Sequence, residues 1–505
     1  MNQSPRVKLS TSAPLQSRKG ERAKDFSLSK TSVVLLFCAA TALAASAQTL
    51  TTIADFTFSE GVDPDAALVE GLNGNLFGTT IAGGSSTHCR VDGGPYGCGT
   101  VFEISPGGTL TTVHRFDNTD GDIPGGLVEA ANGSFYGTTF YGGAYDDGTV
   151  FKISSTGKLT TLYNFCSQTN CIDGNYPTSR LVLGANGNFY GATYGGGANQ
   201  FGTVFEITPT GILTTLYSFC SQTNCADGSG PGLLGLASGG NFYGVTSTGG
   251  ANMGGTAFEI TPDGKLSTLY SFCSQVNCTD GEGPSALIQA ADGMFYGITY
   301  QGGANCCGTV FKITQKGALQ TLYSFCAQTS CADGSHPNGL MQATDGNFYG
   351  TTSAGGLSGD WGTIFKISST GTLTTLHQFC SQPSCGDGAG PQAGLMQATD
   401  GNLYGTTGEG GSCYCGSVFR LSIALGPFVE ALPGFGKAGQ VIGIVGSDLK
   451  GTTSVSFNGT PATRFTVVSE TVIKATVPTG ATTGMIEVSI PNGGLLSNVS
   501  FRILH

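Results

Sequence analysis

The chain has 505 residues, of which 82 are Gly, 17 are Cys and only 11% are charged, and its formal net charge is −11. Gly without a strict third-residue period excludes collagen, and 39% hydrophobic residues exclude a disordered polymer. Low charge with many Thr, Tyr and Phe residues predicts an all-β protein.

The first 47 residues are expected to be a signal peptide with a long basic leader. Residues 1–30 carry seven basic side chains, the apolar stretch Val33–Ala45 follows, and Ala45-Ser46-Ala47 is a small-x-small cleavage site. That stretch is shorter than the ~20 residues of a membrane span. Without the leader, 15 basic and 31 acidic residues remain, a net charge of −16. We predict a secreted monomer, extracellular or periplasmic, that does not bind nucleic acid.

Residues 48–424 contain an internal repeat. The element G-N-F-Y-G-T-T recurs at spacings of 53 to 59 residues, with its aromatic residue at Phe77, Tyr136, Tyr190, Tyr243, Tyr296, Tyr349 and Tyr404. Seven copies of about fifty residues predict a seven-bladed β-propeller.

The third copy illustrates the four strands expected in each blade. They are Arg180–Ala185 (a), Asn188–Thr193 (b), Gly202–Ile207 (c) and Ile212–Phe219 (d). Between strands a and b, Asn186-Gly187 predicts a type I′ hairpin turn.

The two ends of the repeat region complement each other. The region begins with a lone d-type strand, Leu50–Phe58, and its last copy supplies only strands a to c, ending with Ser417–Leu421. Pairing of these two strands would complete the last blade and remove both unpaired edges. We therefore expect a propeller closed by its N-terminal strand.

One stretch carries a family resemblance. The pattern Y-G-T-T…G-G…G-T-I-F-K-I…G-T-L-T-T-L-H-Q-F, from Tyr349 to Phe379, resembles the GloVer tandem repeat of secreted bacterial "choice-of-anchor" proteins. The resemblance covers residues 50 to 421 and implies export and repeat architecture, but no activity. The strand order resembles kelch propellers more loosely.

Residues 425–505 form a second domain, because the period breaks at Gly426. Short alternating strands with turns every 8 to 12 residues predict an immunoglobulin-like sandwich. The segment resembles the IPT/TIG family, which implies a spacer or interaction module.

The cysteines predict disulfides. Cys38 lies in the leader, and the other 16 fall into neighbouring pairs, as in a secreted chain. The predicted bonds join Cys89 to Cys98, Cys166 to Cys171, Cys220 to Cys225, Cys273 to Cys278, Cys326 to Cys331 and Cys380 to Cys385. The pairing of Cys306, Cys307, Cys413 and Cys415 stays open. A zinc site is disfavoured because no His lies between the paired cysteines.

The loop from strand d to the next strand a carries the frame [D/E]-G-x-x-P in every copy. Its acidic residues are Glu60, Asp120, Asp173, Asp227, Asp280, Asp333 and Asp387. One interpretation is a turn in which the carboxylate accepts backbone N–H bonds. The other is a ring of carboxylates able to hold Ca²⁺. No cofactor is expected to be required.

The loops from strand b to strand c open at the same end and vary near their tips. Four of their aromatic residues are candidates for stacking on sugar rings: Trp361, Phe201, Tyr145 and Tyr414.

No catalytic residue is predicted, because H-E-x-x-H, G-x-S-x-G and a Gly-rich loop leading into a helix are all absent. The domain order resembles copper oxidases of the galactose oxidase type, but nothing in the sequence gathers the two His and the Tyr–Cys pair that those enzymes need. The preferred hypothesis is a protein that binds glycan or another extracellular polymer. The alternatives are a structural or adhesive envelope protein and a carbohydrate-active lyase or oxidase.

Overall fold

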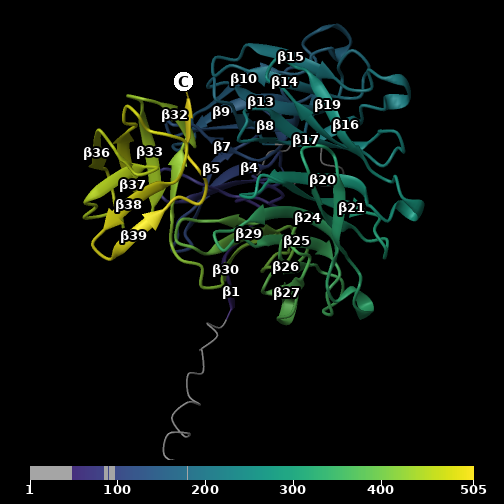
Figure 1. Cartoon of the computed structure of the whole chain (residues 1–505). Coiled ribbons are helices and arrows are strands. Elements are labelled where there is room, and N and C mark those ends of the chain that lie inside the picture. The colour runs from purple at the N-terminus through teal and green to yellow at the C-terminus, as the bar shows by residue number, and fades with distance from the viewer. Residues whose placement is uncertain (1–47, 85–88, 90–96, 179, 505) are drawn as a thin grey trace, which may run out of the picture. The chain divides into compact units, whose positions relative to one another are not determined.

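The fold was obtained as a computed structural model, which describes residues 48–84, 89, 97–178 and 180–504. The predicted signal peptide, residues 1–47, lies outside them. The described residues are almost all strand and loop (Figure 1). Helix occurs in these described residues only as five three-residue 3-10 turns, η1 (Thr169–Cys171), η2 (Thr223–Cys225), η3 (Val276–Cys278), η4 (Thr329–Cys331) and η5 (Pro383–Cys385). In this part of the chain, no helix has the length and apolar character needed to cross a membrane.

The repeat region folds into antiparallel sheets of one design, named here sheets 1 to 7 in chain order. Sheet 1 contains β2 (Val69–Glu70), β3 (Leu76–Thr80), β4 (Thr100–Ile104) and β5 (Leu110–Arg115). Sheet 2 contains β6 (Asp122–Pro124), β7 (Val128–Glu129), β8 (Ser134–Tyr141), β9 (Thr149–Ser154) and β10 (Leu159–Asn164). Sheet 3 contains β11 (Asn175–Pro177), β12 (Val182–Leu183), β13 (Phe189–Gly195), β14 (Thr203–Ile207) and β15 (Leu213–Ser218).

The remaining sheets repeat this order. Sheet 4 contains β16 (Ser229–Leu236), β17 (Phe242–Thr248), β18 (Thr256–Ile260) and β19 (Leu266–Ser271). Sheet 5 contains β20 (Glu282–Gln289), β21 (Phe295–Gln301), β22 (Thr309–Ile313) and β23 (Leu319–Ser324). Sheet 6 contains β24 (Ser335–Gln342), β25 (Phe348–Ala354), β26 (Thr363–Ile367) and β27 (Leu373–Gln378). Sheet 7 contains β28 (Met396–Gln397), β29 (Leu403–Thr407), β30 (Ser417–Ser422) and β1 (Thr49–Asp55).

Strand β1 lies far from the rest of sheet 7 in sequence but pairs with β30 (Figure 1). The register runs from Thr49 opposite Ser422 to Asp55 opposite Ser417. Just beyond it, Phe56 is fully buried and packs edge-on against Phe102 of sheet 1, with ring centroids 4.9 Å apart. Each sheet of the described residues is an open ladder, and none closes on itself.

The predicted strands of the third copy correspond to β12, β13, β14 and β15, but the turn between the first two differs from the prediction. Only Gly187 has a positive φ, whereas a type I′ turn needs two such residues. The Gly187 N–H donates to the Gly184 carbonyl at 2.9 Å, and the Asn186 side chain accepts the Asn188 N–H at 3.2 Å. The Gly184 N–H donates to the Asn188 carbonyl at 2.8 Å, so the loop has three residues and ends on Gly187.

Strands such as β14 are buried on both faces, which explains why their sequences do not alternate between apolar and polar residues. Aromatic side chains of neighbouring sheets meet there, and the Tyr136 and Phe189 rings stack with centroids 4.0 Å apart. The equivalent pair Tyr190 and Phe242 has the same spacing. The core of the repeat region therefore lies between sheets and recurs with the repeat.

The C-terminal segment forms two four-stranded sheets and a short parallel pair. The first sheet contains β31 (Val429–Leu432), β33 (Val441–Gly446), β37 (Val472–Thr476) and β36 (Arg464–Val467). The second contains β35 (Thr460–Pro461), β34 (Ser454–Phe457), β38 (Ile486–Ile490) and β39 (Gly493–Leu496), and β32 (Phe435–Lys437) pairs with β40 (Arg502–Leu504). Ile442, Phe457 and Ile473 belong to their shared core, as expected for a sandwich.

Candidate functional site

Each sheet has two loops at one end of the repeat region, called here the loop end. The exit loop follows the d strand and leads to the next sheet, and the middle loop joins strands b and c. Each middle loop contacts the exit loop that arrives from the preceding sheet. In sheet 3, the Gly197 N–H in the middle loop donates to the Cys171 carbonyl in the incoming exit loop at 2.9 Å. The same bond recurs in every copy, which holds the two loops together.

A second bond links each sheet to its neighbour. The residue before the repeat proline donates its N–H to a middle-loop carbonyl of the preceding sheet, as Tyr176 does to Asp147 at 2.9 Å. The other copies join Ile123 to Cys98, Gly230 to Phe201, Gly283 to Gly254, His336 to Cys307, Gly390 to Trp361 and Asp63 to Cys415. The bond between Asp63 and Cys415, at 3.0 Å, connects sheet 1 to sheet 7.

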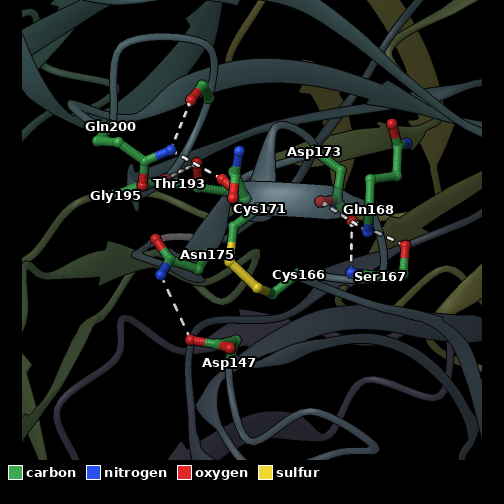
Figure 2. The surroundings of a disulfide bond; sticks show 12 residues. Asp147, Cys166, Ser167, Gln168, Cys171, Asp173, Asn175, Thr193, Gly195 and Gln200 are labelled. Atoms are coloured by element: carbon green, nitrogen blue, oxygen red, sulfur yellow. Dashed lines mark hydrogen bonds between the residues drawn. A yellow bond between two sulfur atoms is a disulfide. The ribbon is translucent and has the colours of Figure 1, made fainter.

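Five of the predicted acidic residues are buried inside their exit loops: Asp173, Asp227, Asp280, Asp333 and Asp387. Figure 2 shows Asp173 beside Ser167 and Gln168. The Asp173 carboxylate accepts bonds from the Ser167 N–H at 2.9 Å, the Gln168 N–H at 3.3 Å and the Tyr163 hydroxyl at 2.8 Å. Each carboxylate thus organises its own exit loop.

In sheet 6, His377 takes the position that Tyr has in most copies. Its Nε2 lies 3.0 Å from the Asp387 carboxylate, so His replaces the tyrosine hydroxyl in the same contact. Burial lowers the pKa of His377, and the nearby Asp387 opposes this effect. For Asp387, burial raises the pKa, but bonds from Ser381 and Gln382 outweigh burial and leave it below the usual value.

Glu60 and Asp120 lie in the two exit loops without cysteines. Glu60 accepts the Thr57 N–H at 3.1 Å, and Asp120 accepts the Asp117 N–H at 3.1 Å and contacts His114 Nε2 at 2.7 Å. They repeat the turn arrangement with different partners.

Within the described residues, two groups bring three potential metal-ligand atoms within 4.8 Å of one another. They are Cys89, Cys98 and Asp122, and Asp147, Cys166 and Cys171. All four cysteines are in disulfides, and neither group includes one of the seven loop acids. Calcium binding by those acids therefore stays a prediction.

The four predicted stacking residues lie in the middle loops of four different sheets. Their exposed fractions are 53% for Tyr145, 47% for Phe201, 37% for Trp361 and 61% for Tyr414. Exposure at these levels leaves a ring face open to a ligand.

A second aromatic set at the loop end was missed by the sequence analysis. Tyr176 stacks on Phe140 with centroids 5.3 Å apart, and His336 packs on Tyr300 at 4.7 Å. Tyr176 and His336 both occupy the position before the repeat proline, with φ of 56°. Residues other than Gly seldom adopt this backbone conformation, which costs about 1–2 kcal/mol. Both residues occupy the second x position of the [D/E]-G-x-x-P frame, whose variation between copies is the sequence signal that could have located them.

Asp63 occupies the same position in sheet 1, with φ of 57°. Burial, and then the charge of Glu409, raise the pKa of Asp63 to about 6. Among the described residues, its Oδ1 is a buried oxygen without a hydrogen-bond partner. Around the loop end, this position therefore carries different chemistry from sheet to sheet.

A hollow of about 560 Å³ lies between the incoming exit loop and the middle loop of sheet 4. Asn224 and Met253 are among its lining residues, and Met253 is 61% exposed. It is an open surface depression at the loop end.

A family model described as the Gloeobacter/Verrucomicrobia repeat matches residues 88–286 and 283–441. The chain belongs to this repeat family. An IPT/TIG domain model matches residues 429–503, so this member of the Gloeobacter/Verrucomicrobia repeat family carries an IPT/TIG domain after its repeats. The predicted resemblances to the GloVer repeat and to the IPT/TIG family are confirmed, whereas the looser resemblance to kelch propellers stays a prediction.

Solved structures similar to this repeat protein are distant in sequence. They include extracellular domains of a one component system and of a hybrid two component system, both of B. thetaiotaomicron, at 12% and 11% identity and TM-scores of 0.47. The alignments cover 91% and 90% of this chain but 58% and 57% of those chains. A protein described as a 6-phosphogluconolactonase of Bacteroides uniformis has 15% identity and a TM-score of 0.41, with coverage of 62% and 84%. No curated protein matches the chain significantly.

Proposed function

We propose that residues 48–424 form a seven-bladed β-propeller closed by β1, and that this propeller acts outside the cytoplasm. Closure is supported by the pairing of β1 with β30 and by the bond from Asp63 to Cys415. Burial of Phe56 against sheet 1 supports it independently, because an open array would leave this end exposed. Disulfides at the loop end fit an oxidising compartment.

On this propeller the loop end binds an uncharged glycan or a similar extracellular polymer. The observation that carries the proposal is the fixed hydrogen-bonded frame of paired loops, from which exposed aromatic rings project at Tyr145, Phe201, Trp361 and Tyr414. Such rings stack on the apolar faces of sugars. Residues 48–505 carry a net charge of −16, which disfavours acidic polymers as ligands.

The test is affinity electrophoresis or calorimetry of the mature chain against soluble uncharged and acidic polysaccharides. Each of the four rim residues is changed to Ala, singly and together. Loss of one stacked ring costs about 1 kcal/mol, so the combined variant is expected to bind more than tenfold more weakly.

The matched control is Ile212→Ala, because Ile212 is 67% exposed on a turn between strands c and d. It is expected to bind like the unmodified chain. Polysaccharide binding that survives the combined rim substitution would overturn the proposal. Capture of protein partners alone would favour a structural or adhesive role instead.

A further inference from the structure

The disulfides at the loop end follow a rule. In five sheets, the exit loop that follows the d strand contains a disulfide, and the bonded pairs are Cys166–Cys171, Cys220–Cys225, Cys273–Cys278, Cys326–Cys331 and Cys380–Cys385. Sheets 1 and 7 have no cysteine there, and their middle loops carry Cys89–Cys98 and Cys413–Cys415 instead. Every sheet thus has one disulfide at this end, which accounts for 14 of the 16 cysteines that follow the leader.

The two remaining cysteines are adjacent in the middle loop of sheet 5, which already has its disulfide. Cys306 and Cys307 are free thiols whose sulfur atoms lie 2.7 Å apart. Cys306 is exposed and Cys307 is partly buried. The equivalent positions in sheet 4 hold Met253 and Gly254, so the loop does not need cysteines to adopt this shape.

The backbone around this pair is fixed. The Gly302 N–H donates to the Cys306 carbonyl at 3.1 Å, the Cys306 N–H donates to Gly303 at 3.3 Å, and the Cys307 carbonyl accepts the His336 N–H at 2.9 Å. The thiols are therefore held together by the loop rather than meeting by chance.

We infer that Cys306 and Cys307 form a redox-active dithiol that an external disulfide oxidises to a vicinal disulfide, separately from the seven structural disulfides. The exposed Cys306 thiolate attacks a sulfur of the external disulfide, forms a mixed disulfide and releases one thiolate. Cys307 then loses its proton, attacks Cys306 Sγ and displaces the second thiolate. Two protons and two electrons leave the pair, and the external disulfide becomes two thiols.

The order of attack follows from the surroundings of the two thiols. Burial and the neighbouring Cys306 raise the pKa of Cys307 to about 11, so Cys307 stays protonated while Cys306 faces solvent. Only the thiolate is nucleophilic, so Cys306 reacts first.

The test uses the mature chain with its seven disulfides intact. The protein is equilibrated with glutathione disulfide, alkylated under denaturing conditions without reductant, and mapped by peptide mass spectrometry. Before oxidation, alkylation is expected on Cys306 and Cys307 alone. After oxidation, that peptide is expected to escape alkylation and to have lost two hydrogen atoms, and mild reduction is expected to restore it.

Two variants define the mechanism. Cys307→Ser is expected to keep a stable glutathione adduct on Cys306, because the resolving thiol is gone. The double variant Cys306→Met with Cys307→Gly copies sheet 4 and is expected to fold and to show no redox-dependent labelling. Three results would overturn the inference: alkylation that persists after oxidation, a lasting glutathione adduct on the unmodified chain, or new label on Cys326 or Cys331.

Discussion

Replacing Asp280 by Ala is expected to destabilise the protein whether or not calcium is present. The fully buried carboxylate accepts bonds from the Tyr270 hydroxyl at 2.8 Å, the Ser274 N–H and hydroxyl at 2.9 Å, and the Gln275 N–H at 3.1 Å. In the variant, the two hydroxyls still pair with each other, because they already lie 2.6 Å apart. Two backbone N–H groups then lose their partner.

The cost follows from those two groups. A buried N–H that loses its acceptor costs about 1–3 kcal/mol. Ser274 and Gln275 are exposed, so water replaces part of the lost bonding, and we expect a total cost of about 2–4 kcal/mol. For a chain of this size, that corresponds to a fall of roughly 2–4 °C in Tm. Differential scanning calorimetry in calcium chloride and in EDTA measures it directly.

The control is Asp263→Ala, because Asp263 is a fully exposed acid in a turn of sheet 4. It is expected to melt together with the unmodified chain in both buffers, because surface substitutions of this kind change stability little. The reasoning is refuted if Asp280→Ala melts with the unmodified chain in both buffers. If the two proteins differ only when calcium is present, the carboxylate holds an ion rather than its loop.

Three further predictions test the ends of the repeat and two titrating groups. In urea denaturation, Phe56→Ala is expected to lower the free energy of unfolding by about 3–5 kcal/mol, whereas substitution of the exposed Phe58 by Ala is expected to lower it little. Equal loss of stability in both variants would argue against a closed repeat. The pKa of Asp63 is raised to about 6, so folding opposes its ionisation and stability falls as pH rises from 3.8 to 6. Asp63→Asn keeps a side chain suited to positive φ. The stability of this variant relative to the unmodified chain should rise by up to about 3 kcal/mol between pH 3 and pH 8, and parallel pH–stability curves of the two proteins would disprove this. The pKa of His377 is lowered below 6.5, so the unfolded chain binds more protons and stability falls as pH drops through 6.5. His377→Tyr should remove that loss while keeping the contact with Asp387, and a variant with unchanged pH dependence would contradict the assignment.

The sequence alone was enough to predict the strands, the repeat length and most disulfides. Strands β13 and β14 were predicted to within two residues, because each repeat carries its own aromatic core residues and turn glycines. The six disulfides could be predicted because their partners lie five or nine residues apart, so chain connectivity brings them together. Local chemistry fixes such features before any sheet meets its neighbour.

Only the tertiary structure decided what depends on contacts between sheets. The packing of Tyr300 on His336 joins different sheets, and the bond from Asp63 to Cys415 joins residues of the first and last sheets. The complementary ends of the repeat predicted that its first and last strands pair, but no spacing in the sequence specifies these individual contacts, because they arise when repeats pack side by side. The same holds for Cys306 and Cys307, whose separation from the seven disulfides becomes evident only when each sheet is seen to carry its own bond.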